Sequence, residues 1–133
     1  MRFAMKIICT AAIAACSVAH SADSAGKYYH GGGVGSVECP EFVNSISQAK
    51  TYGFGTPGYV NAMHGYTMFV SGFQSAYNML TPNTCEIFPA VSSNQALSWV
   101  ENYCRKNPLA KFATGVAALA MSLHSQRLQS CPR

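Results

Sequence analysis

Apolar residues recur at steps of three and four in four stretches of the chain, and this spacing predicts four α-helices. The expected ranges are 40–50, 59–80, 93–106 and 108–128. The positions expected to face the core are Phe42, Val43, Ile46 and Ala49, then Tyr59, Met63, Tyr66, Val70, Phe73 and Tyr77, then Leu97, Val100 and Cys104, and finally Leu109, Phe112, Ala113, Val116, Leu119, Ala120 and Leu123. Because no stretch alternates as a half-buried strand does, the pattern predicts an all-α domain.

Residues between these stretches indicate where the helices begin and end. Ser92 and Gln95 have the spacing of a capping box ahead of the third helix. Asn107 followed by Pro108 is a favourable start for the fourth helix, since Asn caps well and Pro suits the first turn. The Thr51–Gly58 loop contains three glycines and a proline, so it should separate the first two helices.

Several residues within the helices predict close packing. Gly65 and Gly72 lie on one stripe of the second helix, and each costs about 1 kcal/mol relative to alanine. Close approach of another helix would compensate, and a kink near Gly72 is the alternative. Trp99, the only tryptophan, is expected to pack beneath the junction of the last two helices. The methionines expected to fill gaps in the core are Met63, Met68 and Met79.

Residues 1–21 have the pattern of a secretory signal peptide, with a basic start and an uncharged apolar stretch at 7–18. That stretch is too short to span a bilayer. Small residues ahead of Ala22 predict cleavage there. Alternatively, the residues that end at Cys16 resemble a lipoprotein box, in which case Cys16 would be lipidated and the protein would be an outer-membrane lipoprotein.

The rest of the chain divides into a leader and one domain. Residues 22–37 are glycine-rich and lack apolar periodicity, which predicts a flexible leader. Residues 38–133 form the expected helical domain. The leader glycines lack the context of a phosphate loop. His30 is expected to be a solvated linker residue and His124 a surface or rim residue, with no catalytic role assigned to either.

Composition narrows the function classes. From Ala22 onward there are seven Lys and Arg residues against five Asp and Glu residues, so the mature part is nearly neutral. No basic run interleaves with aromatic residues, and we therefore do not expect nucleic acid as a partner. No spaced cluster of His, Cys or acidic residues suggests a metal or a cofactor, and no catalytic constellation is recognisable. The sequence predicts a protein that is not an enzyme.

Four cysteines follow the signal, namely Cys39, Cys85, Cys104 and Cys131. An even count in a short exported chain implies two disulfides, and three pairings are possible. In a plain up-down bundle Cys85 would lie near Cys131, but Cys39 and Cys104 would lie at opposite ends. The long connections between helices also permit a folded-over arrangement, in which the first helix docks beside the end of the third. We therefore expect a compact four-helix domain stapled by two disulfides.

Three short motifs occur near helix ends: Cys39-Pro40-Glu41-Phe42-Val43, Gly72-Phe73 and Val100-x-x-Tyr103-Cys104. Together they resemble the skeleton of HdeA-type periplasmic acid-stress chaperones. The resemblance implies a disulfide between Cys39 and Cys104. The chain departs from those proteins because it has few carboxylates, which leaves little scope for acid-driven opening.

The C-terminal half carries a second set of motifs: Tyr66-x-x-Phe69-Val70-x-Gly72, a cysteine in the next loop, Asn107-Pro108 after a helix, and Cys131-Pro132. This set is similar to that of small periplasmic immunity proteins that neutralise type VI amidase effectors. The resemblance implies a disulfide between Cys85 and Cys131.

From these features we expect a non-enzymatic protein of the bacterial cell envelope, periplasmic or secreted, that binds another protein as an HdeA-like chaperone or inhibitor. The candidate contact surfaces are the exposed side of the second helix and the Thr51–Gly58 loop. An immunity protein that neutralises a secreted peptidoglycan amidase is a second hypothesis. A small hydrolase and a lipidated structural envelope protein are the third and fourth.

Overall fold

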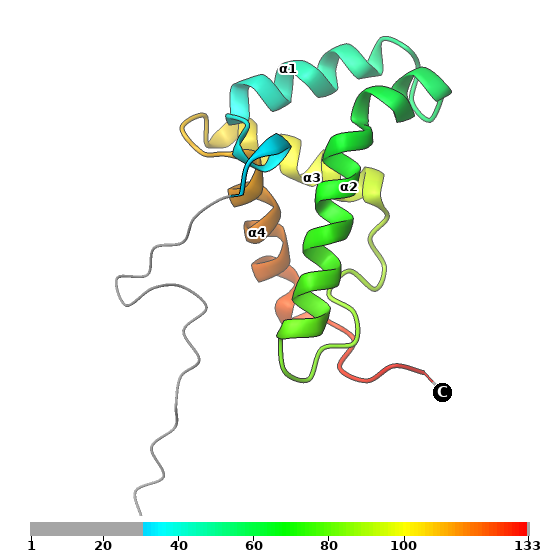
Figure 1. Ribbon diagram of the computed structural model, residues 1–133, viewed down its shortest axis with the longest axis vertical. Helices are drawn as coiled ribbons and strands as arrows, with labels where there is room; N and C mark the ends of the chain where they lie inside the picture. The colour runs from blue at the N-terminus through cyan, green and yellow to red at the C-terminus, as the bar shows by residue number, and fades with distance from the viewer. Residues whose placement is uncertain (1–30, 133) are drawn as a thin grey trace, which may run out of the picture.

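The computed structural model describes residues 31–132, which contain four α-helices and two short 3-10 helices (Figure 1). The α-helices are α1 (Cys39–Lys50), α2 (Pro57–Leu80), α3 (Ser93–Lys106) and α4 (Phe112–Leu123), and the 3-10 helices are η1 (Gly33–Ser36) and η2 (His124–Gln126). These described residues contain two isolated antiparallel bridges, Glu38–Lys111 and Glu86–Leu128, but no strand. The predicted all-α fold is confirmed.

The helices are folded over rather than arranged as a plain up-down bundle. Figure 1 shows α1 lying across one end of the long α2. The helix α1 packs on both α2 and α3, and α3 also packs on α4. Disulfides join Cys39 to Cys104 and Cys85 to Cys131, so both expected pairings are confirmed.

The core lies between all four α-helices, and an aromatic cluster forms where α1, α2 and α4 meet. The rings of Phe42, Tyr66 and Phe112 are mutually in contact, with centroid distances of 4.6 to 5.0 Å between each pair. Such tilted and edge-on pairs contribute about 0.5–1.5 kcal/mol each beyond the area they bury. Most of the predicted core positions of α1 to α3 are buried, and Val43, Phe73 and Tyr77 are half-buried.

The capping box of α3 is confirmed. The Gln95 amide donates to Ser92 Oγ at 3.3 Å, and the Ser92 amide donates to Gln95 Oε1 at 2.8 Å. The helix α2 begins two residues earlier than predicted, because Pro57 suits the first turn and the Thr56 hydroxyl accepts from the Tyr59 amide.

The predicted start of the fourth helix at Pro108 is wrong. Asn107 is instead the C-cap of α3, and its side chain donates to the Tyr103 carbonyl at 2.8 Å. Residues 108–110 form a turn instead of helix, and main-chain bonds to the start of α1 and the segment before it hold the connection in place: the Cys39 amide donates to Ala110 and the Phe112 amide to Val37, both at 2.9 Å. Leu109 was expected in the core but is 95% exposed in this connection.

The C-terminal end of α4 also differs from the prediction. The helix was expected to continue to Leu128, but it ends at Leu123 and η2 follows. Leu128 pairs with Glu86 instead, through two main-chain bonds of 2.8 and 3.1 Å. The bridge competes with helical geometry here, because a residue paired across a ladder cannot also donate along the helix.

The prediction that residues 22–37 form a flexible leader is wrong for the last residues of that range. Residues 1–21, with Cys16, and the leader as far as His30 lie outside the described part of the chain. Gly33–Ser36 form η1, which packs against α2 and α4. Gly35 is buried, and a Cβ there would clash with the Phe69 ring, so the glycine permits the close contact.

Two further packing predictions are wrong. The close neighbour of Gly65 is Val34 of the N-terminal segment rather than another helix, and nothing approaches Gly72, through which α2 continues uninterrupted. The close helix contact lies at Gly115 instead, where a Cβ would be 2.8 Å from Val100. Met63 is buried as predicted, but the other two methionines, Met68 and Met79, are exposed.

Candidate functional site

The helix α3 has two faces of different chemistry. Its inner face is buried and consists of Ala96, Leu97, Val100, Glu101 and Cys104. Its outer face carries large aromatic and amide side chains at steps of three and four, which places them in one stripe. The members of this stripe are Gln95, Trp99, Asn102, Tyr103 and Lys106. Phe54, from the loop between α1 and α2, lies beside this stripe and lines the same hollow as Trp99. We call these six residues the Trp99 groove.

A stacked aromatic pair forms the centre of the groove. The rings of Trp99 and Tyr103 are 5.9 Å apart with an interplanar angle of 14°. Trp99 is 37% exposed, which is high for a large apolar side chain that neighbouring residues already contact. The pair offers a flat apolar surface with polar tips, the combination that favours tyrosine and tryptophan at interfaces.

Two open hollows flank this pair and meet at Trp99 and Asn102. The first has a volume of about 440 Å³, and the second has a volume of about 450 Å³. The lining residues of the first are Phe54, Ser92, Asn94, Gln95, Ser98, Trp99 and Asn102, and those of the second are Trp99, Asn102, Tyr103, Lys106 and Asn107. Side-chain amides both donate and accept hydrogen bonds, so the lining is adaptable.

Phe54 reaches the groove because its loop turns sharply. Gly53 and Gly55 on either side have φ of 91° and 78°, a left-handed conformation that favours glycine. The Thr56 hydroxyl closes the turn by donating to the Gly53 carbonyl at 2.8 Å. Phe54 packs on Tyr59 at a ring distance of 5.0 Å and remains 62% exposed.

The charges near α3 are arranged so that no carboxylate lines the groove. Glu101 points inward, where its two oxygens accept from Lys50 at 2.6 Å and Arg105 at 2.7 Å. Burial by itself raises the pKa of Glu101, but hydrogen bonds and the charges of Lys50 and Arg105 lower it more, so the net pKa shift is downward. Lys106 is therefore the one charged side chain among the residues lining the two hollows.

Two polar groups outside the groove, the Tyr59 hydroxyl and the His124 ring, lie wholly or partly in the interior. The Tyr59 hydroxyl is buried with no hydrogen-bond partner among the described residues, and burial followed by the nearby charge of Glu101 raises its pKa. His124 is half-buried, with Nδ1 2.7 Å from the Tyr77 hydroxyl. Within residues 31–132, no three His, Cys, Asp or Glu side chains lie together as a metal site would require.

The structure relates the predicted surfaces to the groove only in part. The Thr51–Gly58 loop contributes Phe54. The exposed side of α2 lines a smaller hollow of about 130 Å³ with Asn94, beside the groove rather than in it. Trp99 was expected to pack beneath the junction of the last two helices, but it is exposed at the centre of the Trp99 groove. The sequence feature that could have predicted the groove is the stripe of aromatic, amide and lysine side chains on α3, which lies opposite its apolar stripe.

No protein-family model, curated protein or solved structure matches this chain. Among the described residues, no helix combines the length and hydropathy needed to cross a membrane.

Proposed function

We propose that this protein is a non-enzymatic, exported component of the bacterial cell envelope that binds another protein through the Trp99 groove. The observation that carries the proposal is the stack of the exposed Trp99 on the half-buried Tyr103 between two amide-lined hollows. Tryptophan and tyrosine are enriched among the residues that dominate binding energy at interfaces. Amide side chains around such anchors supply adaptable hydrogen bonds.

The two disulfides support the proposed location. Disulfides form and persist in oxidising compartments and are rare in the cytosol. We therefore propose that the protein is periplasmic or secreted. The alternative is that a lipid on Cys16 anchors it to a membrane of the same cell envelope.

Between the two HdeA-like roles, we favour an inhibitor over an acid-activated chaperone. The described carboxylates are only Glu38, Glu41, Glu86 and Glu101. The pKa values of Glu86 and Glu101 are lowered, because hydrogen bonds to the ionised forms outweigh desolvation. Each lowered pKa means that the carboxylate takes up a proton when the domain opens in acid, but four carboxylates are few, so acid couples weakly to the fold. The disulfides also restrain opening at both ends of the domain.

A site-specific photo-crosslinker tests the proposal. We place the crosslinking residue at Asn102 in the groove and, as a matched control, at Leu109, which is exposed but does not line either hollow. In intact cells, position 102 should give a discrete adduct of fixed mass, and Trp99→Ala should reduce it about tenfold or more, as expected for loss of a central anchor. Equal adducts at both positions, no adduct at position 102, or an adduct unaffected by Trp99→Ala would contradict the proposal.

An immunity protein that neutralises a secreted amidase is the narrower alternative. The observed Cys85–Cys131 pairing supports it, since the resemblance to such proteins implied that pairing. The test is protection of growth when an amidase encoded beside this gene is directed to the periplasm. Protection that Trp99→Ala abolishes would identify an amidase as the partner. Failure to protect would contradict the immunity role and favour inhibition of another protein.

A further inference from the structure

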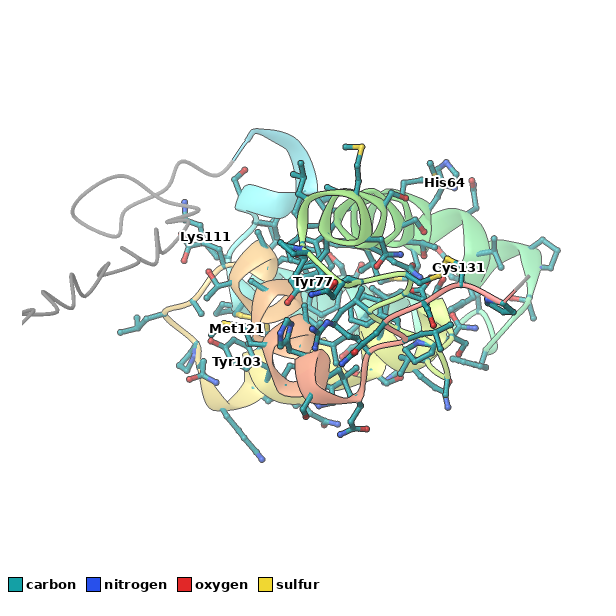
Figure 2. All side chains as sticks on the ribbon, turned by 90° about the horizontal axis from the view of Figure 1, so that it is seen from below. His64, Tyr77, Tyr103, Lys111, Met121 and Cys131 are labelled. Atoms are coloured by element: carbon teal, nitrogen blue, oxygen red, sulfur yellow. A yellow bond between two sulfur atoms is a disulfide. The ribbon has the colours of Figure 1, made fainter. Side chains whose placement is uncertain are left out.

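The two disulfides differ in their access to solvent. Cys39 and Cys104 are 0% and 2% exposed and belong to the core. Cys131 is exposed near the C-terminal end, and its partner Cys85 is half-buried in the loop between α2 and α3. Figure 2, which views the molecule from below, labels Cys131 on the C-terminal segment, to the right of Tyr77. A reagent therefore reaches only one of the two sulfur pairs directly.

Main-chain bonds around the exposed disulfide do not depend on it. The Cys85 amide donates to Leu128 at 2.7 Å, and the Leu128 amide donates to Glu86 at 2.8 Å. The Arg127 side chain adds bonds to the Asn83 carbonyl, at 3.2 Å, and to the Thr84 hydroxyl, at 3.0 Å. Opening the sulfur bond therefore leaves the chain docked as far as Leu128 and frees only the short segment that follows.

We propose that Cys85–Cys131 is a site of thiol–disulfide exchange with an external dithiol, and that Cys39–Cys104 is closed to this reaction in the folded protein. A thiolate of the dithiol attacks Cys131 Sγ, which forms a mixed disulfide and releases the Cys85 thiolate. The second thiol of the dithiol then attacks its own disulfide-bonded sulfur and releases Cys131. The dithiol loses two electrons and two protons, and the protein gains two thiols.

The reactant class is a dithiol, either a small molecule or an oxidoreductase with paired cysteines. Attack at Cys131 is favoured because Cys131 is exposed and Cys85 is half-buried, and access is one of the factors that set exchange rates. Because the segment beyond Leu128 is short and released, the reduced Cys131 thiolate is free to attack a disulfide of another protein, which forms a mixed disulfide and releases one thiolate of that protein. The site thus allows reduction, or covalent linkage to a second protein that carries a disulfide, while the helices stay folded.

Dithiothreitol without denaturant tests this inference on the full mature protein. Samples are quenched with iodoacetamide at successive times, the alkylated cysteines are located by peptide mass mapping, and helicity is followed by circular dichroism. We expect Cys85 and Cys131 to be alkylated about tenfold or more faster than Cys39 and Cys104, because the buried pair reacts only after the domain opens. Helicity should not change during the first phase.

Equal rates, earlier reaction of the buried pair, or loss of helicity together with the first two thiols would overturn the proposal. A Cys85→Ser/Cys131→Ser variant gives a second measurement, in which the fast phase should vanish and the slow phase should remain. A fast phase that persists in this variant would also contradict the assignment. The outcome is independent of the protein-binding proposal, because neither cysteine lines the Trp99 groove.

Discussion

The two disulfides cross-link residues separated by similar lengths of chain, 65 and 46 positions, but they lie in contrasting surroundings. At the first, which we call the junction, Cys39 begins α1, Cys104 lies in the last turn of α3, and both are buried. At the second, which we call the clamp, Cys85 and Cys131 lie in irregular segments near the surface. The junction is part of the core, whereas the clamp fastens a tail to a loop.

This difference separates two contributions of a disulfide to stability, which are the entropy of loop closure and the packing of its sulfur atoms. In the loop-entropy model, closing either loop contributes about 4 kcal/mol, because the dependence on loop length is logarithmic. The model therefore predicts nearly equal effects for the two bonds. Packing predicts unequal effects, since only the junction sulfurs fill space inside the core.

Removing each disulfide in turn gives the largest expected effect. The Cys39→Ala/Cys104→Ala variant should lose about 4 kcal/mol of unfolding free energy from loop closure, and more from the cavity that the missing sulfurs leave. The Cys85→Ala/Cys131→Ala variant should lose at most about 4 kcal/mol. Urea unfolding of both variants, followed by circular dichroism, measures the difference.

The slope of each unfolding curve provides the control, since a changed slope indicates a changed denatured or native state rather than a changed stability. Equal losses in the two variants would mean that loop entropy accounts for the whole effect. A larger loss at the clamp would show that our distinction between the two sites is wrong.

The sequence predicted most of the fold because periodic apolar stripes are local signals. The four helices and the Ser92 capping box followed from spacing alone. The start of α4 did not, because bonds from Val37 and Cys39 to residues far along the chain override the Asn107-Pro108 start signal. Tertiary bonding of this kind has no signature in a short window of sequence.

The groove was less predictable than the fold. Periodicity identifies which face of α3 is apolar, but it does not say whether another element covers the opposite face. The sequence therefore predicts that Trp99, the only tryptophan, packs beneath the helix junction, although its stripe also carries Gln95, Asn102 and Lys106. The position of Phe54 depends on left-handed glycines in its loop, whose conformation a sequence does not specify.

Two glycine substitutions have smaller expected effects, one at a tightly packed position near the junction and one at an open position on α2. Gly115→Ala places a Cβ 2.8 Å from Val100 and 3.2 Å from Tyr103, where α4 meets α3 near the junction. Overpacking should cost about 1–3 kcal/mol and outweigh the gain in helix propensity, which is about 1 kcal/mol. Gly72→Ala on α2 meets nothing within 4 Å and should show only the gain. Thermal unfolding of the two variants should therefore shift in opposite directions, and a shift in the same direction would contradict the close α3–α4 contact.

The smallest expected effect comes from one carboxylate beside each disulfide. Glu101 lies one turn before Cys104 and has charged partners, Lys50 and Arg105, whereas Glu86 follows Cys85 and accepts from neutral ones, the Gln74 side chain and the Phe88 amide. Glu101→Gln should cost about 1 kcal/mol, because the two cations it leaves are partly solvated. Glu86→Gln should cost less, since its amide oxygen can still accept both bonds.

The pH dependence tests this assignment of partners. Desolvation opposes ionisation at both sites, but hydrogen bonds outweigh it and the net pKa of each group is lowered from 4.5. A lowered pKa contributes stability above the unfolded value, and that stability is lost as the pH falls through the folded value. The difference between wild type and Glu101→Gln should therefore be present at neutral pH and shrink below a pH of about 4.5 in urea titrations. A difference that stays constant down to acid pH would mean that Glu101 acts through its shape rather than its charge, and the contrast between the two carboxylates would then disappear.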